Sequence, residues 1–583
     1  MPIDMRIFIL LTLFFMRITC GAQDTSAEDY ADKADERYSE GDYEGAIEAL
    51  NKVIELDPDE KASYYNRGLA KYELDDHQGA LKDFNKVIKL DAKNSEAYAR
   101  RGVIKYELSK YEKAMQDCDK AIELKPDNSE AYTYRGVIKH HLNNYEEAIQ
   151  NFNVAIEFDS GNSEAYAGRC ITKHKLNEHE EAVKDCDKAI ELNAENSNAY
   201  SYRGIVKNKS EDYHEAIQDF NKAIELNAKD SKAYAGRGVA KHRLGDFKGA
   251  IEDCNKAIEL DPNESEMYFS RGLVKSEADK LHEAMDDFNK AIELNPQHSQ
   301  AYTERGAIKL TSEDYYAAIK DCDKAIKIDP KLSKAYFIRG LTKGKIEDFH
   351  NAIKDLGKAI ELNPHDKYIH QAYYYRGYIK SFTGNHREAI EDFDKAIELD
   401  PDNSEYYHNR AATKNELDIY YEALKDCDKA IKLDPDNGKA YYTRGLVMYG
   451  IGERELAVED FNKAMKLDPE NFEVFTMSGL AKSELKKYEL AIEDLNKAIE
   501  LNPNYGDIYF MRGSAKLKLE KYKSSIEDFD KAIELNPEHN TAYFLRGIAA
   551  DQLGDRKRGC SDWHQARRLG NREASSMIEN LCN

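Results

Sequence analysis

The sequence predicts an all-α protein, an α-solenoid of stacked antiparallel helix pairs closed by a C-terminal capping helix. A unit of 34 residues, typified by residues 95–128, recurs through almost the whole chain. Each copy contains two apolar patterns of helical spacing with a polar break between them. A helix pair of this length cannot bury its apolar face alone, so neighbouring copies must stack into one continuous core.

Sixteen copies can be aligned. We number the unit so that Ser95 is position 1 and Gly102 is position 8. Position 8 is held in chain order by Ala34, Gly68, Gly102, Gly136, Cys170, Gly204, Gly238, Gly272, Gly306, Gly340, Gly377, Ala411, Gly445, Gly479, Gly513 and Gly547. Residues 27–364 therefore form repeats 1–10 and residues 372–570 repeats 11–16. The stretch 365–371 is three residues longer than its counterparts and predicts a longer loop, which is either a simple connection or a hinge.

Within the unit, the first helix carries Tyr98 and Gly102 on one stripe, and the turn Leu108-Ser109-Lys110 follows. The second helix carries small residues such as Ala114 and Ala121, which allow the two helices to pack closely. Pro126 ends the second helix, and Asn128 and Ser129 offer caps for the next first helix.

The N-terminus differs from the repeats. Arg6 precedes the apolar run 7–16, which is too short for a membrane span of about 20 residues but suits the core of a signal peptide. Cleavage after Ala22 would remove residues 1–22, and we expect export to the periplasm, the envelope or the medium. Lipid attachment at Cys20 is an alternative, although Arg17 stands where a lipoprotein signal has leucine. Only this attachment would make the membrane a partner.

The C-terminus predicts one further amphipathic helix over residues 571–583, because Ala574, Met577, Ile578 and Leu581 recur at helical spacing. Cys560 and Cys582 lie ten residues before and twelve after Gly570. Folding back at Gly570 would put them at similar height on adjacent helices, where a disulfide could join them.

Two further patterns recur inside the array. Position 24 alternates between bulky and small side chains, in the order Phe84, Cys118, Phe152, Cys186, Phe220, Cys254, Phe288 and Cys322. Cysteines in this slot of distant repeats, including Cys427, cannot reach one another, so all five are expected to be buried free thiols. Arginine at position 7 is followed sixteen residues later by aspartate, as in Arg101 and Asp117, which predicts a ladder of ion pairs.

Composition and motifs argue against several classes of function. The net charge of −24 disfavours nucleic acid or an anionic membrane surface as the main partner. His140, His174 and His242 share position 12, but stacked helices about 8–10 Å apart cannot bring them to one metal. The chain contains no HExxH, Walker-type glycine loop or CxxC, so we expect no cofactor, no metal and no enzymatic activity.

The unit resembles the tetratricopeptide repeat (TPR), which has an aromatic at position 4, glycine at 8, an aromatic at 17, alanine at 20 and 27, and proline at 32. Residues 95–128 match with Tyr98, Gly102, Tyr111, Ala114, Ala121 and Pro126. The resemblance implies a right-handed superhelix whose inner groove, lined by positions 2, 5, 9, 12 and 13 of the first helices, holds partner segments. The aromatic residues at these positions are Tyr65, Tyr72, Tyr106, Phe269, Phe337, Tyr374, Tyr378, Tyr442, Tyr449, Phe510 and Phe544.

These features predict a non-enzymatic, exported scaffold that binds peptides or proteins in its groove, with no small-molecule substrate. Position 9 is apolar in most copies, as in Leu69 and Val103, so the clamp with which some TPR proteins hold acidic tails is missing. Two alternatives remain. The chain could be a recruiting subunit of an enzyme complex, as in sugar transferases that carry such arrays, or a structural component of the cell envelope.

Overall fold

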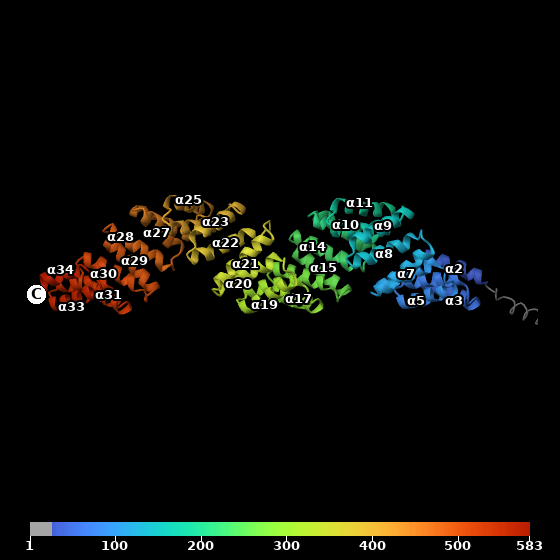
Figure 1. Ribbon diagram of the computed structural model, residues 1–583, viewed down its shortest axis with the longest axis horizontal. Helices are drawn as coiled ribbons and strands as arrows, with labels where there is room; N and C mark the ends of the chain where they lie inside the picture. The colour runs from blue at the N-terminus through green and yellow to red at the C-terminus, as the bar shows by residue number, and fades with distance from the viewer. Residues whose placement is uncertain (1–25, 366, 583) are drawn as a thin grey trace, which may run out of the picture. The chain divides into compact units, whose positions relative to one another are not determined.

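The computed structural model describes residues 26–365 and 367–582. Over this part of the chain it contains 33 α-helices and no strand, and Figure 1 shows the helices following one another in pairs. The predicted signal peptide, residues 1–22 with Cys20, lies outside the described residues. No helix in the described ranges is long and apolar enough to cross a bilayer.

Each repeat supplies a first and a second helix. The first helices are α2 (Ala27–Ser39), α4 (Lys61–Glu73), α6 (Ser95–Glu107), α8 (Ser129–His141), α10 (Ser163–Lys175), α12 (Ser197–Lys209), α14 (Ser231–Arg243), α16 (Ser265–Glu277), α18 (Ser299–Thr311), α20 (Ser333–Lys345), α22 (Ile369–Phe382), α24 (Ser404–Asn415), α26 (Gly438–Gly450), α28 (Phe472–Glu484), α30 (Gly506–Lys518) and α32 (Asn540–Gln552).

The second helices are α3 (Tyr43–Leu56), α5 (His77–Leu90), α7 (Tyr111–Leu124), α9 (Tyr145–Phe158), α11 (His179–Leu192), α13 (Tyr213–Leu226), α15 (Phe247–Leu260), α17 (Leu281–Leu294), α19 (Tyr315–Ile328), α21 (Phe349–Leu362), α23 (His386–Leu399), α25 (Tyr420–Leu433), α27 (Arg454–Leu467), α29 (Tyr488–Leu501), α31 (Tyr522–Leu535) and α33 (Arg556–Arg568). The predicted capping helix is α34 (Ala574–Leu581).

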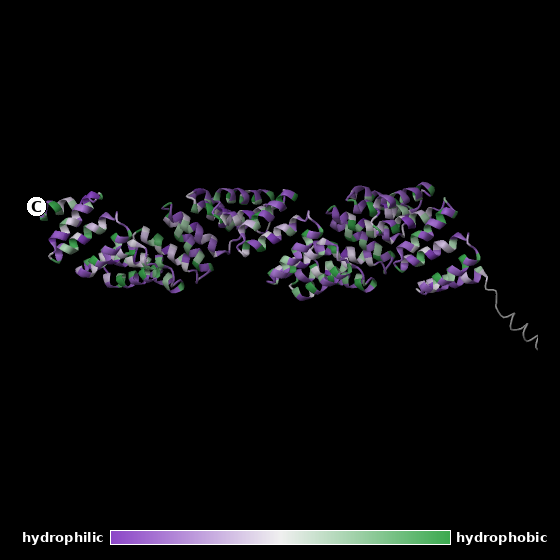
Figure 2. Cartoon of the chain, turned by 90° about the horizontal axis from the view of Figure 1, so that it is seen from below, coloured by the Kyte–Doolittle hydropathy of each residue, from purple (hydrophilic) through white to green (hydrophobic). Residues whose placement is uncertain are grey.

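Contacts divide the chain into two compact units, one ending at Pro296 and one beginning at Gln297. Within each unit, every second helix packs on the first helix of its own repeat and on the first helix of the following repeat. Hydrophilic and hydrophobic residues alternate along the helices (Figure 2). This is the amphipathic pattern of helices that bury one stripe against neighbours.

Helix boundaries follow from capping and turn residues. Asn128 caps α8, its side-chain oxygen accepting a hydrogen bond from the Ala131 amide at 2.9 Å. The second helix before it ends at Leu124, two residues before Pro126. In each repeat, the residue at position 15 lies in the turn between the two helices and has a positive φ, for example 57° at Ser109 and 83° at Gly245. One residue per turn must therefore take the left-handed conformation that glycine adopts most readily.

The alternation at position 24 has a structural explanation in unit 1. A Cβ built on Gly168, at position 6, would lie 2.5 Å from a ring carbon of Phe152, the position-24 residue of the preceding repeat. Where position 24 is Cys118 instead, the next repeat fills the space with Tyr134. Large and small residues thus compensate each other across each boundary, which keeps the packing density constant.

The insertion before repeat 11 forms a shorter connection than predicted. Helix α22 already begins at Ile369, so residues 363–368 connect α21 to α22 where residues 125–128 suffice between α7 and α8. The expected loop over 365–371 is therefore wrong at its C-terminal end, because part of the inserted sequence extends the helix. Tyr368 packs back on α20, with its ring centroid 6.4 Å from that of Phe337. Whether this connection is a hinge stays a prediction.

The arginine–aspartate ladder is present. Arg101 donates from Nε and Nη2 to both carboxylate oxygens of Asp117, at 2.8 and 2.7 Å, and Lys105 donates to the same carboxylate. The remaining arginine nitrogen reaches back to Asn85 of the preceding repeat at 2.7 Å. The Arg101 guanidinium also lies over the ring of Tyr98, 5.1 Å from its centroid. The same arrangement recurs along the array, so each ladder unit joins two neighbouring repeats.

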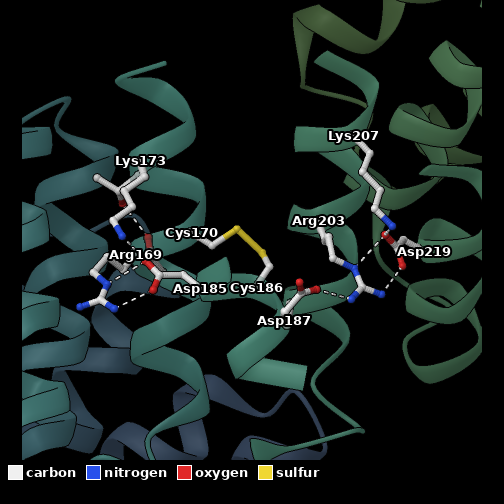
Figure 3. The surroundings of a disulfide bond; sticks show 12 residues. Arg169, Cys170, Lys173, Asp185, Cys186, Asp187, Arg203, Lys207 and Asp219 are labelled. Carbon is white, nitrogen blue, oxygen red and sulfur yellow. Dashed lines mark hydrogen bonds and ion pairs between the residues drawn. A yellow bond between two sulfur atoms is a disulfide. The ribbon is translucent and has the colours of Figure 1, made fainter. Parts of the chain in front are cut away.

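Two disulfides are present in the described residues. Cys560 and Cys582 are bonded, which ties α34 to α33 beside the buried ring of Trp563. Cys170 and Cys186 are also bonded (Figure 3). The prediction that Cys186 is a free thiol is therefore wrong, whereas Cys118, Cys254, Cys322 and Cys427 are buried and unbonded.

The Cys170–Cys186 bond forms because Cys170 stands at position 8, where most repeats have glycine. At Gly102 and Gly238 an added Cβ would lie 3.1 Å from the sulfur of the cysteine at position 24 of the same repeat. Cysteine at position 8, as in Cys170, therefore places its sulfur directly against the position-24 thiol. Around the bond, Arg169 and Lys173 hold Asp185 while Arg203 and Lys207 hold Asp219, so a ladder unit flanks it on each side (Figure 3).

Candidate functional site

The first helices line the inner side of the stack. In unit 1, successive first helices from α6 to α14 contact one another, whereas successive second helices make no comparable contact in the described residues. Elements on the inside of a curved stack lie closest together, so positions 2, 5, 6, 9, 12 and 13 of the first helices form an inner face. Position 5 is small there, as in Ala99 and Ala167, which permits the close approach.

The turn of the stack in unit 1 brings distant repeats together. Lys229, just before α14, forms an ion pair with Asp75, just after α4, with Nζ 2.7 Å from the carboxylate oxygen. Both side chains are mostly exposed, so the pair contributes little stability. The pair shows that repeat 2 lies beside the turn that joins repeats 6 and 7.

Seven of the predicted groove aromatics stand at position 5, and they pack mainly against the residue at position 24. Tyr65 meets Phe84 at a ring-centroid distance of 5.5 Å, and Phe510 meets Phe529 at 6.1 Å. Phe269, Phe337 and Phe544 are only 7–8% exposed. The prediction that these three present a binding surface is wrong, because they fill the space between the helices of their own repeats.

The tyrosines at position 12 are half-buried on the inner face. Burial and the nearby carboxylate of Glu107 raise the pKa of both Tyr72 and Tyr106 to about 12. Burial raises the pKa of Tyr449 to about 12 as well, assisted by its hydrogen bond to Glu484. These hydroxyl groups therefore remain protonated and can donate hydrogen bonds at any physiological pH.

The histidines at position 12 have separate partners. His140 Nδ1 lies 2.9 Å from Thr172 Oγ1, and His242 Nε2 lies 2.9 Å from Glu277. Burial lowers the pKa of His140 and His174 to about 4. Over the described part of the chain, no group of three or more histidine, cysteine or carboxylate side chains could hold a metal ion.

Helix α22 carries the most exposed aromatic surface on the inner face. Tyr374, Tyr375, Tyr378 and Phe382 follow one another at helical spacing and form a single stripe. Tyr378 is 49% exposed and Phe382 70% exposed, while Tyr374 packs on Tyr406 with ring centroids 4.8 Å apart. Exposed aromatic surface of this extent marks interaction sites on soluble proteins. We call these four residues the aromatic stripe.

Two members of the stripe were missing from the sequence prediction. Phe382 stands at position 13, so the repeat register alone would have found it. Tyr375 stands at position 6, which the prediction left out. Of the predicted residues, Tyr442 lies two repeats further on and packs on Phe461 at 6.0 Å, and burial with Glu473 raises its pKa to about 12.

A second region of the inner face, at the N-terminal end, is hollowed. A depression of about 340 Å³ is lined by Tyr65, Asn66 and Glu96 among others, and one of about 270 Å³ by Tyr38, Asn66 and Leu69. Both share Asn66, so they adjoin along the first three repeats. The lining residues stand mostly at the positions that line the predicted groove.

Comparison with protein families identifies the repeat. Models described as TPR repeat or tetratricopeptide repeat match residues 34–75, 62–94, 95–128, 118–150, 265–298, 299–332, 333–366, 370–403, 393–425, 438–471, 479–520 and 506–539, together more than half of the chain. The chain is a tetratricopeptide repeat protein. Residues 136–279 of this TPR protein additionally match the model of the ETO1 C-terminal domain.

Solved structures similar to this TPR protein include YrrB, described as a TPR protein with an unusual peptide-binding site, which is 26% identical over 33% of this chain and all of its own, with a TM-score of 0.31. The APC/C hetero-tetramer Cut9-Hcn1 is 16% identical over 92% of this chain and 98% of its own, with a TM-score of 0.34. Yeast Tom70 is 19% identical over 73% and 96%, with a TM-score of 0.31. No curated protein matches the chain.

Proposed function

We propose that this TPR protein is a non-enzymatic scaffold that binds segments of partner proteins along the inner face of its first helices. The observation that carries the proposal is the aromatic stripe on α22, because it presents rigid, partly exposed rings on the surface where TPR arrays hold partners. Aromatic side chains supply large contact area at low entropic cost, which makes them the usual anchors of protein interfaces.

We further propose that the protein works outside the cytoplasm. The apolar run before Ala22 has the pattern of a signal peptide, and the disulfides Cys170–Cys186 and Cys560–Cys582 need an oxidising compartment to persist. N-terminal sequencing of the protein purified from its native host tests this proposal. A mature chain that begins after Ala22 is expected, and a chain that retains residues 1–22 in the cytoplasm overturns it.

Crosslinking in native cells tests the scaffold function. A photoreactive amino acid introduced in place of Tyr378 should capture a partner. The variants Tyr378→Ala and Phe382→Ala should reduce copurification of that partner. Tyr316→Ala is the matched control, because Tyr316 is 80% exposed but lies on a second helix, α19. A partner that is lost equally from all three variants, or from none of them, contradicts binding on the inner face.

A further inference from the structure

The last repeat of this acidic chain carries a group of unpaired cations. Residues 556–572 contain six lysine and arginine residues and a single acidic residue. Arg556 and Arg558 form ion pairs with nearby aspartates. The other four cations are exposed and form no ion pair with any residue that the structure describes. We call these four the basic cap: Lys557, Arg567, Arg568 and Arg572.

The repeat pattern is broken at the positions of the basic cap. In most repeats, a lysine at position 26 pairs with a glutamate at position 29, as Lys256 does with Glu259. Helix α33 has Gln565 and Arg568 at these two positions, so the anion is replaced by a cation. Arg567 stands at position 28, where the other fifteen copies have isoleucine or methionine. The positive charge is therefore a departure of this repeat from the rest of the array.

The first repeat departs from the array in the opposite direction. Residues 27–60 contain thirteen aspartate and glutamate residues and three lysine and arginine residues, which makes this repeat the most acidic of the sixteen. Glu28, Asp32 and Asp35 stand at positions 2, 6 and 9 of α2, along one stripe of the inner face. All three are exposed and form no ion pair with a described residue. Asp35 is the one charged residue at position 9 among the sixteen copies.

The side chain of Asp35 borders the depression of about 270 Å³ on the inner face. Leu50, Leu69 and Tyr38 supply the apolar part of its lining, and Leu50 is 2% exposed. Among the described residues, Asn66 donates to the Asp35 carboxylate over a long distance of 3.5 Å. An arginine side chain suits such a place, because its aliphatic stem covers apolar surface while its guanidinium donates two hydrogen bonds to a carboxylate.

We propose that the basic cap of one copy docks on the first repeat of a second copy, with an arginine in the depression beside Asp35. The charges of the two surfaces are complementary, and the first repeat is the most acidic surface that the chain offers. Because the two surfaces differ, the contact is heterologous, and copies join head to tail into a ring or an open filament. Exposed ion pairs are weak, so we expect an association that depends strongly on salt.

Sedimentation velocity tests the inference on the untagged chain, purified from its host so that both ends are native. At about 0.1 M salt the chain should associate as its concentration rises. At about 1 M salt it should be monomeric, because the Debye length falls from about 10 Å to about 3 Å. Arg567→Gln combined with Arg568→Gln should weaken the association about tenfold or more, since it removes two cations from the contact.

A second double variant shows whether two different surfaces meet. Asp32→Asn combined with Asp35→Asn should weaken the association as much as the arginine variant does. A mixture of the two double variants should form a dimer that grows no further, because each variant keeps the surface that the other has lost. Glu489→Gln combined with Glu493→Gln removes two exposed carboxylates from the second helix α29 and is the control for net charge. This control should associate like the wild type.

Several outcomes overturn the inference. They are a chain that stays monomeric at about 0.1 M salt, a mixture of the double variants that stays monomeric, and an equal loss of association in the α29 control. A monomer that instead binds inorganic polyphosphate through Arg567 and Arg568 also overturns it, because the occupant of the basic cap is then not a second copy. Circular dichroism shows that each variant keeps its helices. The proposed function is independent of this result, since partner capture at Tyr378 uses neither surface.

Discussion

Cys170 is bonded to Cys186, sixteen residues further along the same repeat, in the two slots where other repeats place a glycine against a cysteine or an aromatic ring. The spacing equals that of the ladder arginine and its aspartate, because both pairs join the same turn of the first helix to the same turn of the second.

Cys170→Gly should restore the standard repeat and preserve the fold. It removes a crosslink over sixteen residues, so stability should fall by up to about 3 kcal/mol under oxidising conditions. Thermal unfolding followed by circular dichroism, with and without reductant, measures this loss. Cys254→Ala is the control, because Cys254 is not bonded and its removal should leave the response to reductant intact. A variant that unfolds like the wild type at all redox conditions would contradict a stabilising role.

The remaining buried thiols should be inert in the native protein. Burial raises the pKa of Cys118, Cys254 and Cys322 to about 12, so almost no thiolate is present at pH 8. A thiol-reactive dye should label these thiols only in the unfolded chain. All three should therefore react at the rate at which the protein unfolds. Rapid labelling of the folded chain at pH 8 would show that the slot opens locally.

Truncating a ladder aspartate should be far more costly than breaking a surface pair. Asp253 receives hydrogen bonds from Arg237 at 2.6 and 2.9 Å and forms an ion pair with Lys241, so Asp253→Ala leaves two half-buried cations without their partner. We expect a loss of about 3–5 kcal/mol in urea unfolding. Asp253→Asn should cost less, because Asn151 already accepts from Arg135 at 2.6 Å in repeat 4.

The control for the ladder is Glu259→Ala. It breaks the exposed Lys256–Glu259 pair, which should be worth less than about 1 kcal/mol. Equal losses of stability for Asp253→Ala and Glu259→Ala would mean that the ladder pairs contribute no more to the free energy of unfolding than an exposed ion pair does.

Trp563 should report on the C-terminal cap alone. It is the single tryptophan of the chain, fully buried beside Ile578 of α34, and its Nε1 donates to the carbonyl of Phe544 at 3.2 Å. Ile578→Ala should loosen the cap by about 2–4 kcal/mol and shift the tryptophan emission to longer wavelength at lower urea than the loss of helix. Leu495→Ala, equally buried in repeat 14, should lower overall stability without changing the native emission.

His408 should destabilise the protein when it gains a proton. Burial, assisted by Lys439, lowers its pKa to about 4 from the usual 6.5, and its Nε2 lies 3.1 Å from Thr443 Oγ1. Between these two pH values the unfolded chain binds the proton and the folded chain does not. Stability should therefore fall as pH drops from 6.5 toward 4, by up to about 1.4 kcal/mol per pH unit. His408→Asn should reduce the slope in thermal unfolding measured from pH 7 to 4.5.

The sequence predicted the parts of the fold that repeat. Helix pairs, small residues at the close contacts and the ladder partners all follow from a fixed register, because the same residue types recur at the same positions in most of the sixteen repeats. The Cys170–Cys186 bond was missed because cysteines were compared only within one slot, although the ladder spacing already joined the two slots.

The inner face was harder to predict because position alone does not determine exposure. Phe337 and Tyr378 both stand at positions that line the predicted groove, yet Phe337, at position 5, is 7% exposed because it packs in the core cluster with Leu356, whereas Tyr378, at position 9, is 49% exposed.

The compensation between Phe152 and Gly168 limits how the length of this chain can change. Loss of repeat 5 alone would set Phe152 against Tyr202, two bulky groups in one space, and loss of repeat 4 alone would set Cys118 against Gly168 and leave a void. Loss of both would set Cys118 against Tyr202, a combination like the existing one of Cys118 and Tyr134. Repeats 3–7 can therefore be gained or lost without disruption only in even numbers, so a recombining gene would change here in steps of two repeats.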